Sequence, residues 1–559
     1  MMDNQRLILA LVFCFSLFML WTGWQKHTHA PVAQTTPATK SAAAPASATA
    51  SSAATSAPVP TASGLSVPQQ ASAAPAAQPA EAYPVITVKS DMMVAEISAQ
   101  GGDVIKVELT HHKASGNRKQ DFVLVDPKYD YRAQSGLIGP GLPNHKTIWQ
   151  LPGKEADMTV GEKELRVRLT APAADDVEVS KTYVFHRGSY VIDVEYDIAN
   201  HGAKAISPEA YFQLVRDGKA PADGNSHVAA YTGPAFYTAA DNFKKVEFKK
   251  IAKNEEKVPD NADNGWVAMV QHYFVTAWLP AAGPTREFYA EELGAGSDLF
   301  RAGVKLPVAA IAPGAIGKLT VPFYAGPQEQ EKLAKIAPGF DRVVDYGWLT
   351  VIAKPIFWVL NWLHSFTGNW GWSIILMTVM LKAAFFPLSA TSYKSMAKMR
   401  LLTPKMQKIK ETFADDRERM NREMMELYKK EKVNPLGGCL PIAVQIPVFI
   451  ALYWVLGGTV ELRGAPWLGW ITDLTAKDPY YILPLIMGAT MFLQTKLNPT
   501  PPDPMQAKIM MIMPIAFTAM FLFFPSGLVL YWTVSNLLSI AQQWKVNRMM
   551  EASGLKPRR

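Results

Sequence analysis

Cysteine is nearly absent from this 559-residue chain, which contains only Cys14 and Cys439. Two widely separated cysteines form neither a disulfide framework nor a zinc cluster. His111 and His112 lack further ligands at metal-binding spacing, and we interpret them as part of a surface loop. The patterns G-x-x-x-x-G-K-[ST], H-E-x-x-H and G-x-S-x-G are also missing, which argues against an ATP-driven machine, a zinc protease and an α/β-hydrolase. We therefore expect a protein that is not an enzyme and that holds no metal and no cofactor.

Charge is unevenly distributed along the chain. The formal net charge of +8 is modest, and no basic stripe with interleaved aromatic residues predicts sequence-specific nucleic-acid binding. The mean hydropathy of +0.01 averages two different parts. Residues 83–325 are typical of a soluble domain, whereas residues 348–544 contain long apolar runs. These runs lack Asp and Glu, which disfavours a proton-coupled transporter because such proteins often use intramembrane carboxylates.

The first 29 residues predict a signal anchor. Leu7–Trp24 is an uncharged apolar run of 18 residues, about the shortest length that spans a bilayer. No small-x-small cleavage site follows it directly, although a cleaved signal peptide is the alternative. Residues 30–82 are almost entirely Ala, Pro, Ser, Thr and Gln. Such a segment cannot bury enough apolar surface to fold, so we interpret it as a disordered linker.

Residues 83–326 predict an all-β sandwich. Val177–Phe185 and Tyr190–Ile198 flank a short turn, and apolar and acidic residues alternate in the second arm. This alternation is typical of a strand with one buried face, and the pair predicts a hairpin. Similar short strands recur along the domain. Trp266–Trp278 is the main stretch that is compatible with a helix.

Residues 327–368 predict two helical segments between this domain and the first apolar run. Gln328–Ile336 is polar, whereas Trp348–Phe366 combines tryptophans with basic residues along an apolar stripe. Such a combination is typical of an amphipathic helix lying in the membrane interface. The alternative is a membrane span, which would have to bury Lys354 and Pro355.

Five apolar segments follow. The last apolar run is too long for one span and breaks at Phe524-Pro525-Ser526-Gly527. Several segments have only about 16 to 18 residues, or about 24 to 27 Å of helix, which is shorter than a hydrocarbon core of ~30 Å. Local thinning of the bilayer is therefore expected. The predicted spans are residues 369–388, 435–460, 479–495, 509–524 and 527–544.

Basic residues predict the orientation of these spans. The connection 389–434 contains twelve Lys and Arg residues, whereas the connection 461–480 contains two. Because basic connections stay in the cytoplasm, the first is predicted to be cytoplasmic and the second external. The basic tail 545–559 is predicted to be cytoplasmic as well. Together with the signal anchor, six spans result, with both termini inside and the β domain outside.

The basic connection also predicts a helical hairpin. Tyr393–Ala414 has methionines and other apolar residues at helical spacing, and Asp415 or Asp416 caps a second helix. A methionine-rich surface adapts to varied partners, so Met399 and Met424 are candidate docking residues. The alternative is that these methionines hold the two helices together.

Lys382 is the only charged side chain between Gly371 and Lys394. An ammonium group within a membrane span costs several kcal/mol unless it faces protein or water, which makes Lys382 a candidate functional residue. We expect it in a hydrated, positively charged cavity. The alternative is a lysine near a helix end whose ammonium extends to the lipid headgroups.

Six short motifs lie outside the linker. They are Asn434-Pro435-Leu436-Gly437-Gly438-Cys439, Gln445-Ile446-Pro447, Asp478-Pro479-Tyr480-Tyr481-Ile482-Leu483-Pro484, Phe524-Pro525-Ser526-Gly527-Leu528, Ser395–Met399 and Gly265–Pro280. Together they closely resemble the YidC/Oxa/Alb family of membrane protein insertases. The resemblance covers nearly the whole chain outside the linker. The large domain before the apolar segments is similar to that of the Gram-negative branch.

The resemblance implies a cytoplasm-open hydrophilic groove among five spans, with one basic residue in it. That residue is often arginine in the family, and Lys382 occupies its position here, which keeps the charge but loses the fixed fork of five donors. Thr378 lies one helical turn before Lys382 and on the same face. Gln445, Tyr531 and Trp532 match groove-lining or substrate-contacting positions of the family.

The resemblance further implies that the protein inserts and helps to fold integral proteins of the bacterial inner membrane, without an energy source of its own. It implies nascent membrane proteins as clients. The implied partners are the Sec translocon with its accessory subunits, ribosomes or targeting factors, and membrane lipids. A transporter or channel is the first alternative, and a membrane enzyme is the second. Reconstitution of the purified protein in liposomes distinguishes insertion of a small client from flux of a solute.

Overall fold

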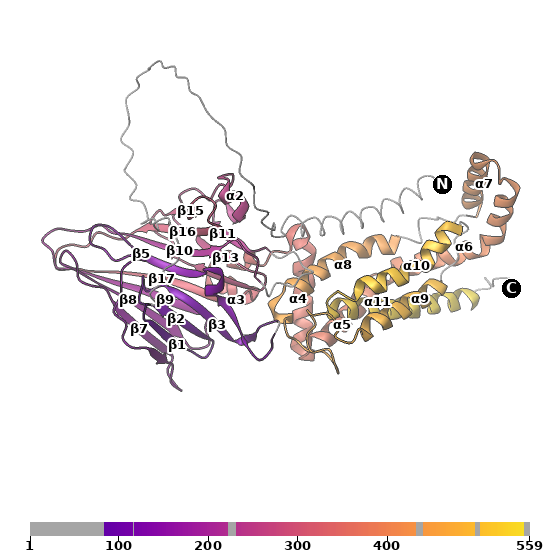
Figure 1. Cartoon of the computed structure of the whole chain (residues 1–559). Coiled ribbons are helices and arrows are strands. Elements are labelled where there is room, and N and C mark those ends of the chain that lie inside the picture. Colours follow the sequence, from indigo (N-terminus) through magenta and orange to yellow (C-terminus); the bar gives the residue numbers. More distant parts are fainter. Residues whose placement is uncertain (1–82, 116, 222–230, 432–439, 498–503, 553–559) are drawn as a thin grey trace, which may run out of the picture. The chain divides into compact units, whose positions relative to one another are not determined.

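The computed structural model describes residues 83–115, 117–221, 231–431, 440–497 and 504–552. The predicted signal anchor, the predicted linker, both cysteines and the end of the basic tail lie outside the described residues. The motif Asn434–Cys439 lies outside them as well. Figure 1 labels most of the strands and helices in the described part of the chain.

The first sheet of the β domain has nine strands. They are β1 (Val85–Lys89), β2 (Met93–Ser98), β3 (Val104–Lys113), β4 (Asp121–Val125), β5 (Arg132–Ile138), β6 (Glu155–Asp157), β10 (Glu209–Asp217), β15 (Glu287–Glu292) and β16 (Leu299–Pro307). Their order is β15-β16-β10-β5-β3-β2-β1-β6, and β4 pairs with β3. All neighbours are antiparallel except β1 and β6. Sequence-distant strands thus meet in one sheet.

The second sheet has eight strands. They are β7 (Glu164–Thr170), β8 (Val177–His186), β9 (Val191–Asn200), β11 (Gly233–Thr238), β12 (Asn242–Lys245), β13 (Trp266–Val270), β14 (Phe274–Trp278) and β17 (Ile316–Pro327). Their order is β12-β11-β13-β14-β17-β9-β8-β7. The rings of Tyr196 and Phe212, one from each sheet, lie 6.4 Å apart in the shared core. The predicted sandwich and the predicted hairpin of β8 and β9 are confirmed.

Two expectations for this domain are wrong. The stretch Trp266–Trp278 forms the paired strands β13 and β14 rather than a helix. Every residue of both strands is buried, and a strand that is covered on both faces has a continuous apolar sequence without the period of two. His111 and His112 lie in β3 rather than in a loop. The His112 ring packs edge-on against Phe274 at 5.2 Å.

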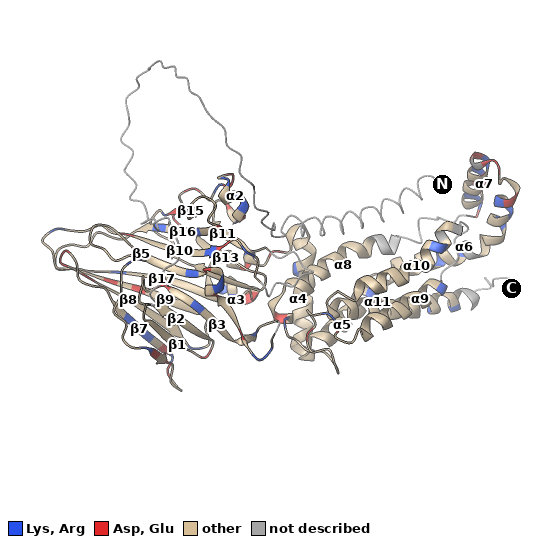
Figure 2. Cartoon of the chain, viewed as in Figure 1, with Lys and Arg blue, Asp and Glu red and all other residues tan. Residues whose placement is uncertain are grey.

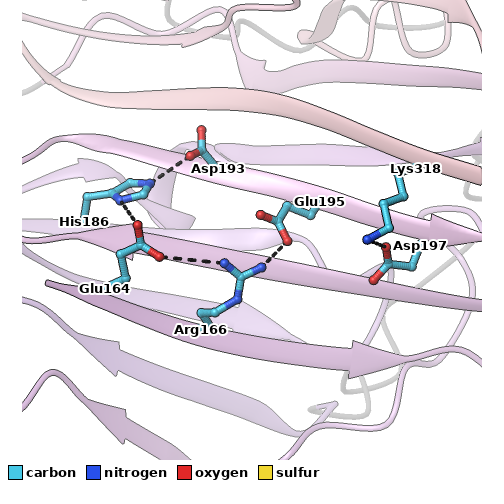
Figure 3. Close-up of polar contacts among 7 residues, drawn as sticks. All are labelled: Glu164, Arg166, His186, Asp193, Glu195, Asp197 and Lys318. Atoms are coloured by element: carbon cyan, nitrogen blue, oxygen red, sulfur yellow. Dashed lines mark hydrogen bonds and ion pairs between the residues drawn. The ribbon is translucent and has the colours of Figure 1, made fainter. Parts of the chain in front are cut away.

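The outer face of the second sheet carries a ladder of charged side chains across four strands (Figure 3). The strand register places Glu164 opposite His186 and Asp197 opposite Lys318. The two ring nitrogens of His186 lie 3.5 Å from Glu164 and 2.8 Å from Asp193. The ladder comprises Glu164, Arg166, His186, Asp193, Glu195, Asp197 and Lys318. Exposed pairs of this kind contribute at most about 1 kcal/mol each, so the ladder mainly keeps this face hydrated.

A polar cluster lies inside the sandwich around Lys181 and Asp103. Nζ of Lys181 donates to the carbonyl oxygens of Gly101 at 3.2 Å and Gly102 at 3.0 Å. Both glycines have positive φ, 71° and 58°, and a Cβ on Gly101 would lie 2.6 Å from Oδ1 of Asp103. The turn that presents these carbonyls therefore requires glycine. Oδ2 of Asp103 accepts a hydrogen bond from Gln134 at 2.7 Å.

Burial of this cluster makes the stability of the domain depend on pH. It raises the pKa of Asp103 from 3.8 to about 7 and lowers the pKa of Lys181 from 10.5 to about 8. The unfolded chain ionises Asp103 at lower pH than the folded one, so the free energy of unfolding falls as pH rises from about 4 to about 7. The folded chain loses the Lys181 proton at lower pH than the unfolded one, so the free energy of unfolding rises again as pH rises from about 8 to about 10. The two groups in their ionised forms therefore destabilise the domain most near pH 7 to 8.

The described part of the chain contains ten α-helices, of which one lies between β12 and β13 and the others follow β17. They are α2 (Phe248–Ala252), α3 (Gln330–Ile336), α4 (Thr350–Thr367), α5 (Trp370–Ala384), α6 (Phe386–Thr412), α7 (Arg417–Lys430), α8 (Leu440–Gly458), α9 (Ile482–Leu497), α10 (Pro504–Phe521) and α11 (Ser526–Ala552). Within the described ranges no single helix has both the length and the apolar composition needed to cross a membrane. Helix α5 and residues 386–399 of α6 reach that length and composition only when they are taken together, and they are bent by 64° relative to each other. Figure 2 shows that charged residues gather on α6 and α7.

Helix α4 buries one face against the protein and exposes large apolar side chains on the other. Ile356, Leu360 and Leu363 are buried, whereas Trp358 and Trp362 are 66% and 47% exposed. The buried residues follow the spacing of one helical face. Exposed tryptophans agree with the membrane-interface interpretation of this helix, which stays a prediction.

Helices α6 and α7 form the predicted hairpin. The side chain of Asp416 accepts a hydrogen bond from the backbone N–H of Arg419 at 2.9 Å and caps α7, as expected for one of the two candidate aspartates. Leu402, Met406 and Met424 form a small buried cluster between the two helices.

Candidate functional site

Lys382 lies in the last turn of α5, immediately before the chain bends by 64° into α6. Pro387 has no backbone N–H and cannot donate to the carbonyl oxygen of Ala383, four residues earlier. The N–H of Phe385 donates to the carbonyl oxygen of Leu381 at 3.0 Å and also to that of Ala383. Lys382 therefore occupies a position where one apolar helix ends and a more polar helix begins.

The ammonium of Lys382 is held by neutral groups from two other helices. Nζ donates to Oγ of Ser539 on α11 at 2.7 Å and to Oε1 of Gln445 on α8 at 3.5 Å. The described parts of α5, α8, α9 and α10 contain no Asp or Glu, and neither does α11 before Glu551. Neutral acceptors orient a charge without cancelling it. The site therefore retains a net positive charge that an anionic group would stabilise.

Gln445 links this cation to α11 through both ends of its amide. Its Oε1 faces Lys382, and its Nε2 donates to the hydroxyl of Tyr531 at 3.3 Å and to Oγ of Ser535 at 3.0 Å. Three of the predicted groove residues, Lys382, Gln445 and Tyr531, are thus brought together in one hydrogen-bond network.

The α11 side of the network is a stripe of polar residues along one helical face. Tyr531, Ser535, Ser539 and Gln542 are separated by four, four and three residues, which places them on the same side of the helix. Tyr531, Ser535 and Ser539 are 2%, 6% and 4% exposed. Sequence reasoning missed the two serines and Gln542. Their helical spacing within an uncharged apolar run is the signal that could have identified them.

Two other predicted groove residues make different contacts. Thr378 is 1% exposed, and its hydroxyl donates to the carbonyl oxygen of Ile374 in its own helix at 2.7 Å. Trp532 is half-buried and packs edge-on against Phe449 with ring centroids 4.7 Å apart. Neither side chain joins the Lys382 network in this structure, and the groove role of both stays a prediction.

The candidate docking residues lie in the small cluster of the hairpin. Met424 is 4% exposed, and the half-buried Met399 packs against the same cluster. These contacts are what the packing interpretation requires. Docking would require the hairpin to expose these side chains, and it stays a prediction.

The other ends of α5 and α11 are covered by the connection between α8 and α9. Nδ2 of Asn369, which caps α5, donates to the carbonyl oxygen of Pro466 at 3.1 Å. Oγ of Ser526, at the start of α11, donates to the carbonyl oxygen of Asp473 at 2.9 Å. Lys382 lies about twelve residues further along α5, or ~18 Å at ~1.5 Å per residue. The polar network is therefore near the end of the helices that leads into α6.

A lysine beside a serine also occurs in hydrolases with a Ser–Lys pair, but this pair is not arranged for that chemistry. Oγ of Ser539 donates to the carbonyl oxygen of Ser535 at 2.8 Å, and the side chain is buried. Ser539 lies inside a continuous helix whose backbone N–H groups are used within the helix, so its neighbours offer no donors to an oxyanion. The arrangement is suited to holding a charge rather than to attacking a carbonyl group.

Two family models match most of the chain. The model described as YidC periplasmic domain matches residues 85–359, and the model described as 60Kd inner membrane protein matches residues 362–553. The boundary between the two matches falls within α4.

Curated proteins and a solved structure are similar to the chain as well. A protein of Aromatoleum aromaticum named membrane protein insertase YidC is 56% identical over 566 residues and covers 100% of both chains. A protein of Dechloromonas aromatica with the same name is 54% identical, with coverage of 99% of this chain and 98% of that protein. A crystal structure described as an active YidC insertase with its first transmembrane domain resolved is 18% identical with a TM-score of 0.39, and the match covers 82% of this chain and 94% of that one.

Proposed function

The chain belongs to the YidC family of membrane protein insertases, and we propose that it inserts integral membrane proteins through a polar groove that ends at Lys382. The observation that carries this proposal is the ammonium of Lys382, which contacts Ser539 and Gln445 and has no carboxylate partner among the described residues. A positive charge without a counterion among apolar helices is costly unless it serves a function. An acidic group of an arriving client would supply the missing counterion.

The groove lowers the free-energy barrier for moving a client's polar tail across the membrane, and it supplies no free energy of its own. Helices α5 and α9 have 15 and 16 residues, or about 22 to 24 Å at ~1.5 Å per residue, against a hydrocarbon core of ~30 Å. Thinning of the bilayer around such short helices, together with a polar groove, shortens the apolar distance that a client's polar tail crosses. The free energy comes from burial of the client's own apolar segment, about 25 cal/mol per Å². Insertion of this kind is not an enzymatic reaction.

The proposed groove opens on the cytoplasmic side only. The basic residues of α6 and α7 support a cytoplasmic location of the hairpin, and the network around Lys382 lies near the end of α5 that leads into it. The connection between α8 and α9 covers the opposite end through Asn369 and Ser526. We therefore propose the six-span topology with both termini in the cytoplasm of the bacterial cell and the β domain outside the inner membrane.

Family membership supports several partners. The clients are nascent membrane proteins, and membrane lipids receive them once they leave the groove sideways. We propose the Sec translocon with its accessory subunits as a partner for clients with large external domains. Ribosomes or targeting factors would meet the basic hairpin at the cytoplasmic face.

Reconstitution of the purified full-length protein alone in liposomes tests the function. A client with one or two spans should become protected from external protease only in vesicles that contain the protein. The same vesicles should not release a trapped ion or small solute. Solute release without client insertion would favour a channel or transporter and would overturn the proposal.

A further inference from the structure

Residue 382 is held at two points by one stretch of α11. Its side-chain ammonium donates to Oγ of Ser539 at 2.7 Å, and its backbone carbonyl oxygen accepts from Nε2 of Gln542 at 3.2 Å. Ser539 and Gln542 are three residues apart and therefore face the same way. One helix thus fixes both the main chain and the charge of Lys382.

The hydrogen bond from Gln542 reaches a backbone carbonyl oxygen at the end of α5. Carbonyl oxygens in the last turn of a helix lose their donors from the following turn, and the bend before Pro387 ends α5 at this point. A polar backbone group among apolar helices is costly unless it finds a donor elsewhere. Gln542 supplies that donor from a neighbouring helix.

The same stretch of α11 also contacts the chain beyond the bend. The hydroxyl of Tyr393 on α6 donates to the backbone carbonyl oxygen of Ser539 at 3.4 Å. Residues 539–542 therefore touch α5 on one side of the 64° bend and α6 on the other. Loss of Gln542 would alter the bend and the position of Lys382 together, whereas loss of the Tyr393 hydroxyl would leave both contacts of Lys382 with α11 in place.

We propose that Ser539 and Gln542 are positioning residues for Lys382, and that with Tyr393 they set the angle at which α6 and the hairpin leave the other helices. This inference rests on the proposed function, because the position of the ammonium matters only if it receives a client's acidic group. Without Gln542 the main chain at 382 can rotate about the bend. The ammonium then leaves Gln445 and the polar stripe.

The test compares Gln542→Leu with Gln543→Leu in the full chain. Both substitutions replace a side-chain amide with an apolar side chain of similar size. Nε2 of Gln543 donates to the carbonyl oxygen of Leu497, at the end of α9, at 3.3 Å. Gln543→Leu is therefore a matched control, because it removes a comparable hydrogen bond from α11 at a point away from the bend.

Two readouts are measured for each variant. The first is the ratio of insertion rates for two clients that differ only in acidic or neutral tail residues. The second is the distance between spin labels at the exposed residues Glu426 on α7 and Trp544 on α11, measured in a cysteine-free background.

Gln542→Leu should lower the acidic-to-neutral ratio about fivefold, the factor that corresponds to loss of one net hydrogen bond, and should broaden the distance distribution. Gln543→Leu should change neither. Tyr393→Phe should broaden the distances and leave the ratio unchanged. If Gln542→Leu does not fold, Ser539→Ala removes the nearer of the two acceptors of the ammonium and should lower the ratio to a similar extent.

Lys382→Ala in the same assay separates this inference from the proposed function. If Lys382→Ala leaves the ratio unchanged, the proposed role of the charge is wrong. If Lys382→Ala lowers the ratio while a folded Gln542→Leu protein matches the wild type in both readouts, the positioning role is overturned and the proposed function stands. Equal effects of Gln542→Leu and Gln543→Leu would also overturn the positioning role, because they would show a general loosening of α11.

Discussion

Replacing Lys382 with alanine should slow the insertion of clients with acidic tails about 30-fold and leave clients with neutral tails nearly unaffected. Two unit charges 4 Å apart attract by about 1 kcal/mol in water and by about 4 kcal/mol at an effective permittivity of 20. Lys382 is half-buried and is held by two neutral partners, so we expect a value of about 2 kcal/mol between these limits. A difference of that size in the barrier corresponds to about 30-fold in rate.

Other substitutions at this position test the sign of the effect. Lys382→Arg should retain most of the activity, because single oxygen atoms of Ser539 and Gln445 accept from either cation. Lys382→Glu should impair acidic clients more than alanine does, because it adds repulsion. Lys394→Ala removes an exposed basic residue from α6 and is the matched control.

The assay measures initial rates of protease protection in proteoliposomes, for client pairs that differ only in the charge of the translocated tail. Equal slowing of both clients by Lys382→Ala would refute the electrostatic reasoning. No slowing of either client would favour a lysine that extends to the headgroups.

Thiol labelling adds an independent check of the groove. A cysteine at 382, in a background lacking Cys14 and Cys439, should react with a polar thiol reagent from the cytoplasmic side. A cysteine at 378 is a weaker test of a water-filled groove, although this position lies one helical turn from Lys382. Thr378 is 1% exposed, so a cysteine there would stay unreactive whether or not water fills the groove beside Lys382.

Three further predictions concern the other parts of the chain. Deleting the β domain while keeping both flanking membrane segments should leave insertion of simple clients largely intact, since the Lys382 network lies outside that domain; a variant that reaches the membrane in normal amounts yet inserts nothing would contradict this. Photo-crosslinkers at Met399 and Met424 should capture ribosome-bound nascent chains or targeting factors, because a cluster of three buried side chains opens at little cost; crosslinks confined to the two helices would favour simple packing. Asp103→Asn should raise the thermal unfolding temperature of the full-length protein at pH 7.5 and weaken the fall in stability between pH 4 and pH 7, because a buried amide has no charge to desolvate; an unchanged pH profile would show that another group is responsible.

Local patterns were sufficient for part of the fold. The alternation in β9 predicted a strand with Ile192 and Val194 buried and Asp193 on the outer face, because a period of two reports one-sided burial directly. The same reasoning failed for Trp266–Trp278, since a strand that is buried on both faces has no alternation to detect. The order of the strands in each sheet was also beyond local patterns, because pairing partners such as β9 and β17 are far apart in the sequence.

The sequence by itself determined that Lys382 is an isolated charge in an apolar run, and its family resemblance identified Gln445, Tyr531 and Trp532 as candidate groove residues. Only the tertiary structure decided that the ammonium contacts Ser539, which is 157 residues away, and that Gln542 holds the carbonyl of the same lysine. The physical reason is that these helices are apolar on nearly every side, so hydropathy does not indicate which face meets which neighbour. Helix packing sets that rotation, and it alone places a serine hydroxyl and a glutamine amide against Lys382 at the bend.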